Sequence, residues 1–142
     1  MALIETDAAL RDLLARTKTI AVLGIKAGEA DDAYRVPRYM QATGHRILPV
    51  NPKLERLFGE PSAPSLARVG QPYELLDVFR APRHLPAHVD EILALETPPA
   101  AVWFQLGIRD DASAERLAEA GLDVVQDRCL MVEHRRLFGP AA

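Results

Sequence analysis

The sequence predicts an α/β protein with a mainly parallel five-stranded sheet and helices on both faces. The chain has 142 residues, which is enough for one substantial hydrophobic core. Short apolar runs alternate with amphipathic helical patterns, and no repeat or low-complexity linker interrupts them. We therefore expect residues 1–142 to form a single Rossmann-like domain, with right-handed crossovers and the strand order 3-2-1-4-5.

The expected elements follow one another regularly along the chain. Thr6 or Asp7 can cap a first helix, and Gly44 and Gly121 end two later ones. Each expected strand is a short apolar run bounded by turn residues. The strands are expected at 19–24, 45–50, 74–79, 100–105 and 122–126, and further helices at about 33–43, 83–95 and 110–120 and from near residue 128.

Composition and charge exclude several classes of protein. The formal charge of −3 argues against broad binding to nucleic acid or anionic membranes. No apolar run is long enough to span a membrane, and the acidic first residues do not resemble a signal peptide, so we expect a cytoplasmic protein. The single cysteine, Cys129, excludes an internal disulfide or a cysteine metal cluster. Scarce lysine and eleven prolines suit a heat-adapted source or equally a GC-rich genome.

Ligands of such sheets bind where the strands end, so the residues that follow each strand are candidate site residues. Gly24 ends the first strand, and the absence of a side chain there would let backbone N–H groups approach a phosphate. Neither G-x-G-x-x-G nor a P-loop pattern follows, and two isolated glycines such as Gly24 and Gly28 more commonly serve only to turn the chain. After the second strand, Asn51-Pro52-Lys53 supplies a cation where NAD-binding proteins have a carboxylate, which favours coenzyme A or NADP. Asn51-Pro52 is also an ordinary turn signal.

Two arginines and a phenylalanine add to this candidate anion site. Arg35 lies in the first turn of its expected helix, where the helix dipole disfavours a cation unless an anion compensates. Arg80 directly follows the third strand, and Phe79 beside it could stack on a purine or belong to the core. Exposed arginines are also common without a ligand, so both explanations stay open.

Cys129 and the histidine pair have plausible chemical roles and simpler alternatives. A helix N-terminus and Arg128 would stabilise the Cys129 thiolate, whereas Asp127 opposes that effect and packing is the commoner role of a free cysteine. His84 and His88 have the i, i+4 spacing of metal ligands but no third ligand. We expect no metal and a solvated helix face there.

Six segments in order carry a resemblance to a known family: "IAVLG", "YRVPRYM", "ILPVNPK", "DVFR", "WFQLG" and "VVQDRC". Over about residues 15–135 the chain resembles the small stand-alone CoA-binding proteins, whose domain is similar to that of the succinyl-CoA synthetase α subunit. The family usually has Ala-Ser where this chain has Ile25-Lys26, and Ser where it has Ala33.

The resemblance implies three groups of ligand contacts. The first group binds adenosine and pyrophosphate, the second lies beside the ribose phosphate, and the third lines the adenine side. The first comprises Gly24, Lys26, Tyr34 and Arg35, the second Asn51, Pro52 and Lys53, and the third Val78, Phe79 and Arg80; Ile25, Gln105, Gly107 and Cys129, at the same strand ends, complete the candidate site.

The expected function is binding of coenzyme A or an acyl-CoA without catalysis, as a carrier, a sensor or a subunit of a larger assembly. The phosphohistidine domain and ATP-binding partner of the synthetases do not fit in the remaining chain, which argues against acyl-CoA synthesis. A protein partner or a homo-oligomer is compatible with this role. Two alternatives stay open: an NADP-linked oxidoreductase using the same cationic loop, and a thiol or CoA-disulfide redox module using Cys129.

Overall fold

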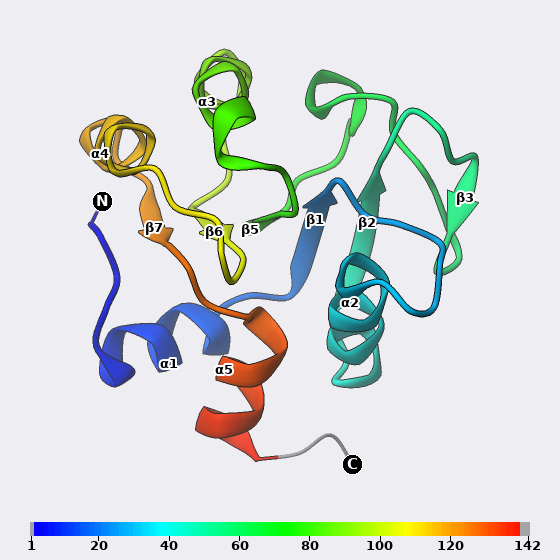
Figure 1. Cartoon of the computed structure of the whole chain (residues 1–142), viewed down its shortest axis with the longest axis horizontal. Helices are drawn as coiled ribbons and strands as arrows, with labels where there is room; N and C mark the ends of the chain where they lie inside the picture. Colours follow the sequence, from blue (N-terminus) through cyan, green and yellow to red (C-terminus); the bar gives the residue numbers. More distant parts are fainter. Residues whose placement is uncertain (1, 140–142) are drawn as a thin grey trace.

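A five-stranded parallel sheet forms the centre of the protein, as the sequence predicts (Figure 1). The computed structural model describes residues 2–139. Each strand is short and almost entirely buried, in keeping with a parallel sheet covered on both faces. In spatial order the strands are β2 (Arg46–Val50), β1 (Thr19–Leu23), β5 (Leu75–Val78), β6 (Ala101–Phe104) and β7 (Asp123–Val125).

The predicted strand order 3-2-1-4-5 is wrong, because the third long strand, β5, pairs with β1 and leaves β2 at the edge. Pro49 gives the physical reason. Its carbonyl oxygen accepts a hydrogen bond from the Ala63 amide at 2.9 Å, so this residue's polar groups face away from β1. A proline cannot donate to a ladder and is tolerated in edge strands, whereas the predicted order would have placed it between two neighbours.

Short segments cover both edges of the sheet. Beside β2, the hairpin of β3 (Arg56–Leu57) and β4 (Glu60–Pro61) leads into a parallel bridge between Ala63 and Val50. Beside β7, the Val124 backbone pairs with residues 2–4 near the N-terminus. Covered edges do not present unpaired backbone groups to other chains. The hairpin turns at Phe58-Gly59, both with positive φ, and was not predicted.

The helices divide between the two faces as Figure 1 shows, with α3 and α4 on one side and α1, α2 and α5 on the other. Thr6 caps the first helix by accepting from the Ala9 amide, and Asp110 caps the fourth through the Ser113 amide. The helices are α1 (Asp7–Ala15), α2 (Asp32–Ala42), α3 (Leu85–Leu93), α4 (Asp111–Glu119) and α5 (Leu130–Phe138), with 3-10 turns η1 (Leu66–Arg68) and η2 (Pro82–His84). None of the helices between residues 2 and 139 combines the length and apolarity needed to cross a membrane.

One buried side chain departs from the apolar pattern of the core. Asp77 lies on the central strand β5, in register between Val22 and Trp103, and is fully buried. Neither of its carboxylate oxygens has a hydrogen-bond partner among the described residues. Burial without a hydrogen-bond donor therefore raises the pKa of Asp77 well above its usual value.

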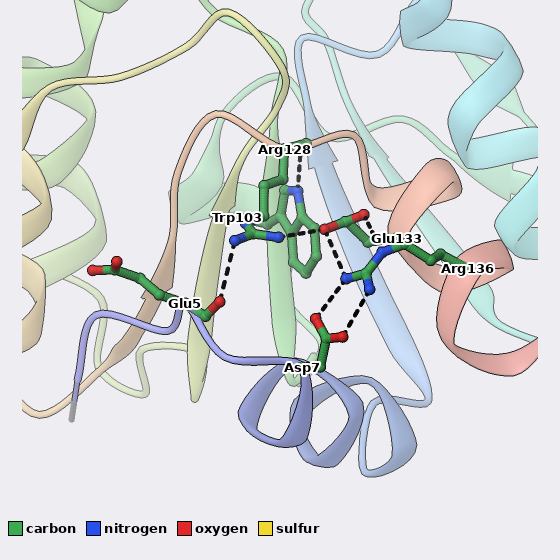
Figure 2. A network of polar contacts seen from close by, with 6 residues as sticks. All are labelled: Glu5, Asp7, Trp103, Arg128, Glu133 and Arg136. Carbon is green, nitrogen blue, oxygen red and sulfur yellow. Dashed lines mark hydrogen bonds and ion pairs between the residues drawn. The ribbon is translucent and has the colours of Figure 1, made fainter.

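A polar network connects the first helix, α1, with the last helix, α5 (Figure 2). The buried Glu133 carboxylate accepts from Arg128 at 2.5 Å and from Arg136 at 3.2 Å, and Arg136 also binds Asp7 at 2.8 Å. The Trp103 indole N–H donates to the Arg128 carbonyl. Burial disfavours ionised Glu133, but the hydrogen bonds and charges of Arg136 and Arg128 outweigh it, and the pKa of Glu133 is lowered. The network holds α5 against α1.

We expect Glu133→Gln to lower the free energy of unfolding by about 2–3 kcal/mol at pH 7, because it leaves a partly buried arginine without its carboxylate. The lowered pKa makes this stabilisation available above the carboxyl's unfolded value, and it is lost as the pH falls through the folded value. Urea unfolding at pH 7 and below pH 4 should therefore give a difference between native and variant that shrinks in acid. A difference that persists unchanged in acid would contradict this role.

Candidate functional site

The carboxyl ends of the strands carry two clefts that meet at Arg80. The larger, of about 410 Å³, lies beside the start of α2 and is lined by Lys26, Phe79 and Gly107 among others; we call it the α2 cleft. The smaller, of about 210 Å³, lies beside α3 and is lined by Gly24 and Pro52 among others; we call it the α3 cleft. Arg80 lines both, so one elongated ligand could pass from cleft to cleft across its guanidinium.

Arg80 forms no ion pair within the described part of the chain. Among residues 2–139 no carboxylate lies within ion-pair distance of it, whereas Arg128 and Arg136 are both paired. Its Nε donates instead to His88 Nε2 at 3.1 Å, and His88 Nδ1 lies 2.8 Å from a Glu91 carboxylate oxygen. A half-buried guanidinium whose bonded partner is an imidazole keeps its positive charge available for an anion.

The α2 cleft contains charges of both signs. Lys26 is exposed and forms no ion pair within the described part of the chain. Asp31 and Asp32 line the same cleft, at the positive end of α2. Arg35 pairs with Asp32, so this carboxylate, and not a bound anion, compensates the arginine that the sequence places in the first turn. The cations available to a ligand here are Lys26 and Arg80.

The loop after β2 is held by its own hydrogen bonds. Asn51 Nδ2 donates to the Ile25 carbonyl at 2.7 Å, and Asn51 Oδ1 accepts from the Lys53 amide at 2.8 Å. The amide thus ties the β1 and β2 loops together and forms an Asx turn, in agreement with the turn interpretation. Pro52 lines the α3 cleft, and the exposed Lys53 side chain forms no ion pair in the residues described.

Gly24 is required by the protein's own backbone. Its φ is +84°, and a Cβ built on it would lie 2.4 Å from the Phe79 carbonyl oxygen and 3.3 Å from Arg80 Cδ. Its amide donates to the Val50 carbonyl. The group that approaches Gly24 closely is therefore the backbone after β5, in place of the expected phosphate. This approach brings Arg80 next to the end of β1.

Gly24→Ala should lower the free energy of unfolding by about 2 kcal/mol, through the left-handed φ and the collision with the Phe79 carbonyl. Thermal unfolding by circular dichroism measures this. Gly107→Ala is the matched control, since Gly107 also has positive φ (+83°) but a Cβ there meets nothing within 4 Å. Equal losses in the two variants would show that the close approach at Gly24 costs nothing.

Several other predicted site residues have structural contacts. The Ile25 and Val78 side chains are fully buried in the core, so only their backbone is at the site. Tyr34 packs on Phe58 of the hairpin, with ring centroids 5.2 Å apart. Gln105 is buried and its Oε1 accepts from the Leu130 amide at the start of α5.

Cys129 lies at the N-cap of α5, partly buried against the core on that face. It is not among the residues that line either cleft. The expected helix start beside the thiol is confirmed to within two residues. The structure thus brings Lys26, Phe79, Arg80 and Gly107 together at one cleft and leaves Cys129 outside it.

Sequence reasoning missed the residues that helix α3 contributes to the site. His88 and Glu91 line the α3 cleft together with Ser65. His88 was expected on a solvated helix face, yet its side chain is only 14% exposed because it turns toward Arg80. The i, i+4 spacing with His84 identified His88 as a residue of interest. Its contact with Arg80, in the loop after β5, depends on the fold.

A further cleft of about 380 Å³ lies at the opposite end of the strands, between residues 66–73 and 95–97. Glu96 is the charged residue in its lining. The described lining of this cleft therefore offers no cation to an anionic ligand. The two clefts joined by Arg80 form the better candidate site.

Comparison with known proteins identifies the family of the chain. The family model described as "CoA binding domain" matches residues 18–135. The chain belongs to this CoA-binding family. A curated relative, the uncharacterized protein YneT of Bacillus subtilis, is 32% identical over 129 residues, which cover 91% of this chain and 94% of YneT.

Two solved structures resemble this member of the CoA-binding family closely. A Thermus thermophilus protein is 48% identical, with a TM-score of 0.88 over 94% of this chain and 100% of its own. A hypothetical protein from Pyrococcus horikoshii is 33% identical, with a TM-score of 0.87 over 95% of this chain and 94% of its own. The predicted resemblance and the α/β fold class are both confirmed.

Proposed function

We propose that the protein binds coenzyme A or an acyl-CoA in the two joined clefts and acts as a carrier, sensor or subunit without catalysis of its own. The observation that carries the proposal is Arg80, a half-buried cation at the junction of the clefts that has no carboxylate partner among residues 2–139. The pyrophosphate would lie against its guanidinium. Membership of the CoA-binding family supports the same ligand.

The distribution of positive charge supports an elongated ligand with several phosphates. Lys26 lines the α2 cleft. Lys53 directly follows Asn51 and Pro52, which line the α3 cleft. CoA has a pyrophosphate and a separate 3′-phosphate on its ribose, which need cations at two places. We assign the 3′-phosphate to Lys53 and the pyrophosphate to Arg80 and Lys26.

Titration calorimetry with CoA and dephospho-CoA tests the proposal. CoA should bind about 10- to 100-fold more tightly, since it adds a charge-assisted hydrogen bond from Lys53, on the order of 1.5–3 kcal/mol. Lys53→Gln should remove most of that preference, whereas Lys18→Gln, an exposed lysine before β1, should retain it. Equal affinities of the native protein for the two ligands would show that Lys53 does not contact the phosphate.

A further inference from the structure

His88 lies between a cation and an anion at the edge of the α3 cleft. Its ring accepts from Arg80 Nε at 3.1 Å and lies 2.8 Å from Glu91, with 14% of the side chain exposed. The arginine Nε can only donate, so His88 Nε2 must be unprotonated and Nδ1 must carry the proton toward Glu91. The observed arrangement therefore contains neutral His88 in a single tautomer.

A second proton on His88 is incompatible with this arrangement. It would place an N–H on Nε2 facing the Arg80 N–H at 3.1 Å and would put two positive charges in contact. Glu91 still pairs with Nδ1 in the doubly protonated ring, so His88 stays with Glu91 and Arg80 must move away.

We propose that His88 is a positioning residue for Arg80. Protonation of His88 releases Arg80 from its place between the α2 and α3 clefts and weakens binding of the anionic ligand in acid. This inference rests on the proposed function, because it concerns the cation that the ligand would contact. Histidine is the side chain that ordinarily changes charge between pH 5 and 8.

The other groups around His88 do not supply an alternative switch. On its own face the charged and titratable neighbours are Arg80, Glu91 and His84, whose ring centroid is 6.5 Å away, with Arg83 beside His84. The segments across the α3 cleft contribute no titratable group; their polar side chains there are Asn51 and Ser65. His84 donates no described hydrogen bond to Arg80 and is a natural control.

Calorimetric affinities at pH 8.0 and pH 5.5 test the inference, with dephospho-CoA as the probe. CoA's own 3′-phosphate gains a proton near pH 6, and dephospho-CoA lacks it, so its charge stays constant over this range. We expect the native protein to bind dephospho-CoA about tenfold more weakly at pH 5.5. Circular dichroism at both pH values checks that the fold is intact.

Variants separate positioning from general electrostatics. His88→Gln keeps an oxygen acceptor for Arg80 and cannot be protonated, so its affinities at pH 8.0 and pH 5.5 should differ little from each other. His84→Gln should retain the native pH dependence. A native affinity that is unchanged or stronger in acid, or a His88→Gln variant that weakens as much as the native protein, overturns the inference alone. Absence of binding of both CoA and dephospho-CoA at pH 8.0 overturns the proposed function and this inference with it.

Discussion

Arg80→Gln should weaken binding of CoA by about a hundredfold while leaving the fold intact. The reason is that the substitution removes the cation shared by both clefts, and no other side chain of residues 2–139 lines both. A charge-assisted, bidentate contact to a pyrophosphate contributes this order of affinity. Because no carboxylate pairs with Arg80 in residues 2–139, its removal leaves no buried acid unsatisfied, and the melting temperature should change little.

Two variants control for the change of charge at Arg80. Arg83→Gln removes the same charge from an exposed position three residues along the chain, and calorimetry should show nearly native affinity. Arg80→Lys keeps the charge but loses the fixed fork of donors, so its affinity should lie between those of the native protein and Arg80→Gln. Equal losses in Arg80→Gln and Arg83→Gln would show that only net charge matters.

Asp77→Asn should stabilise the protein, and by more as the pH rises. Burial favours the protonated form of the folded carboxyl by raising its pKa, whereas the unfolded chain ionises near the usual aspartate value. Folding above that value must therefore take up a proton, and the free energy of unfolding falls by up to about 1.4 kcal/mol per pH unit until the folded pKa is reached. Asparagine has nearly the same shape and does not ionise.

Chemical unfolding of the native protein and Asp77→Asn at pH 5 and pH 8 measures this difference. The stabilisation by Asp77→Asn should be larger at pH 8. Glu115→Gln, an exposed change of the same charge on α4, should show no such trend. A stability difference for Asp77→Asn that is independent of pH would mean that the buried carboxyl is ionised in the folded protein.

The fold class and most elements were predictable from sequence because each depends on local patterns. Apolar runs and capping residues such as Thr6 and Asp110 identify the strands and helices without knowledge of their neighbours. The strand order depends on long-range pairing, yet Pro49 within the second strand was a readable signal of an edge position. Asp77 within "ELLDVF" was likewise visible as an acid in a buried run.

The candidate site was predictable only in part. The rule that ligands bind at the carboxyl ends of parallel strands led to Arg80, Lys26 and Gly107, which the structure brings to one cleft. The contact of His88 with Arg80 depends on how α3 packs across the loop after β5, and eight residues of sequence separation do not fix that direction. Gly24 was identified correctly as a position of close approach, but the approaching group is the Phe79 carbonyl.

Titration of the native protein with CoA, and in parallel with NADP and NAD, tests the central claim most directly. The account predicts saturable binding of one CoA per chain, weaker binding of NADP, and the weakest binding of NAD, which lacks the phosphate assigned to Lys53. Absence of binding by CoA, or a preference for NAD, would contradict the assignment of the two clefts and Arg80 to coenzyme A.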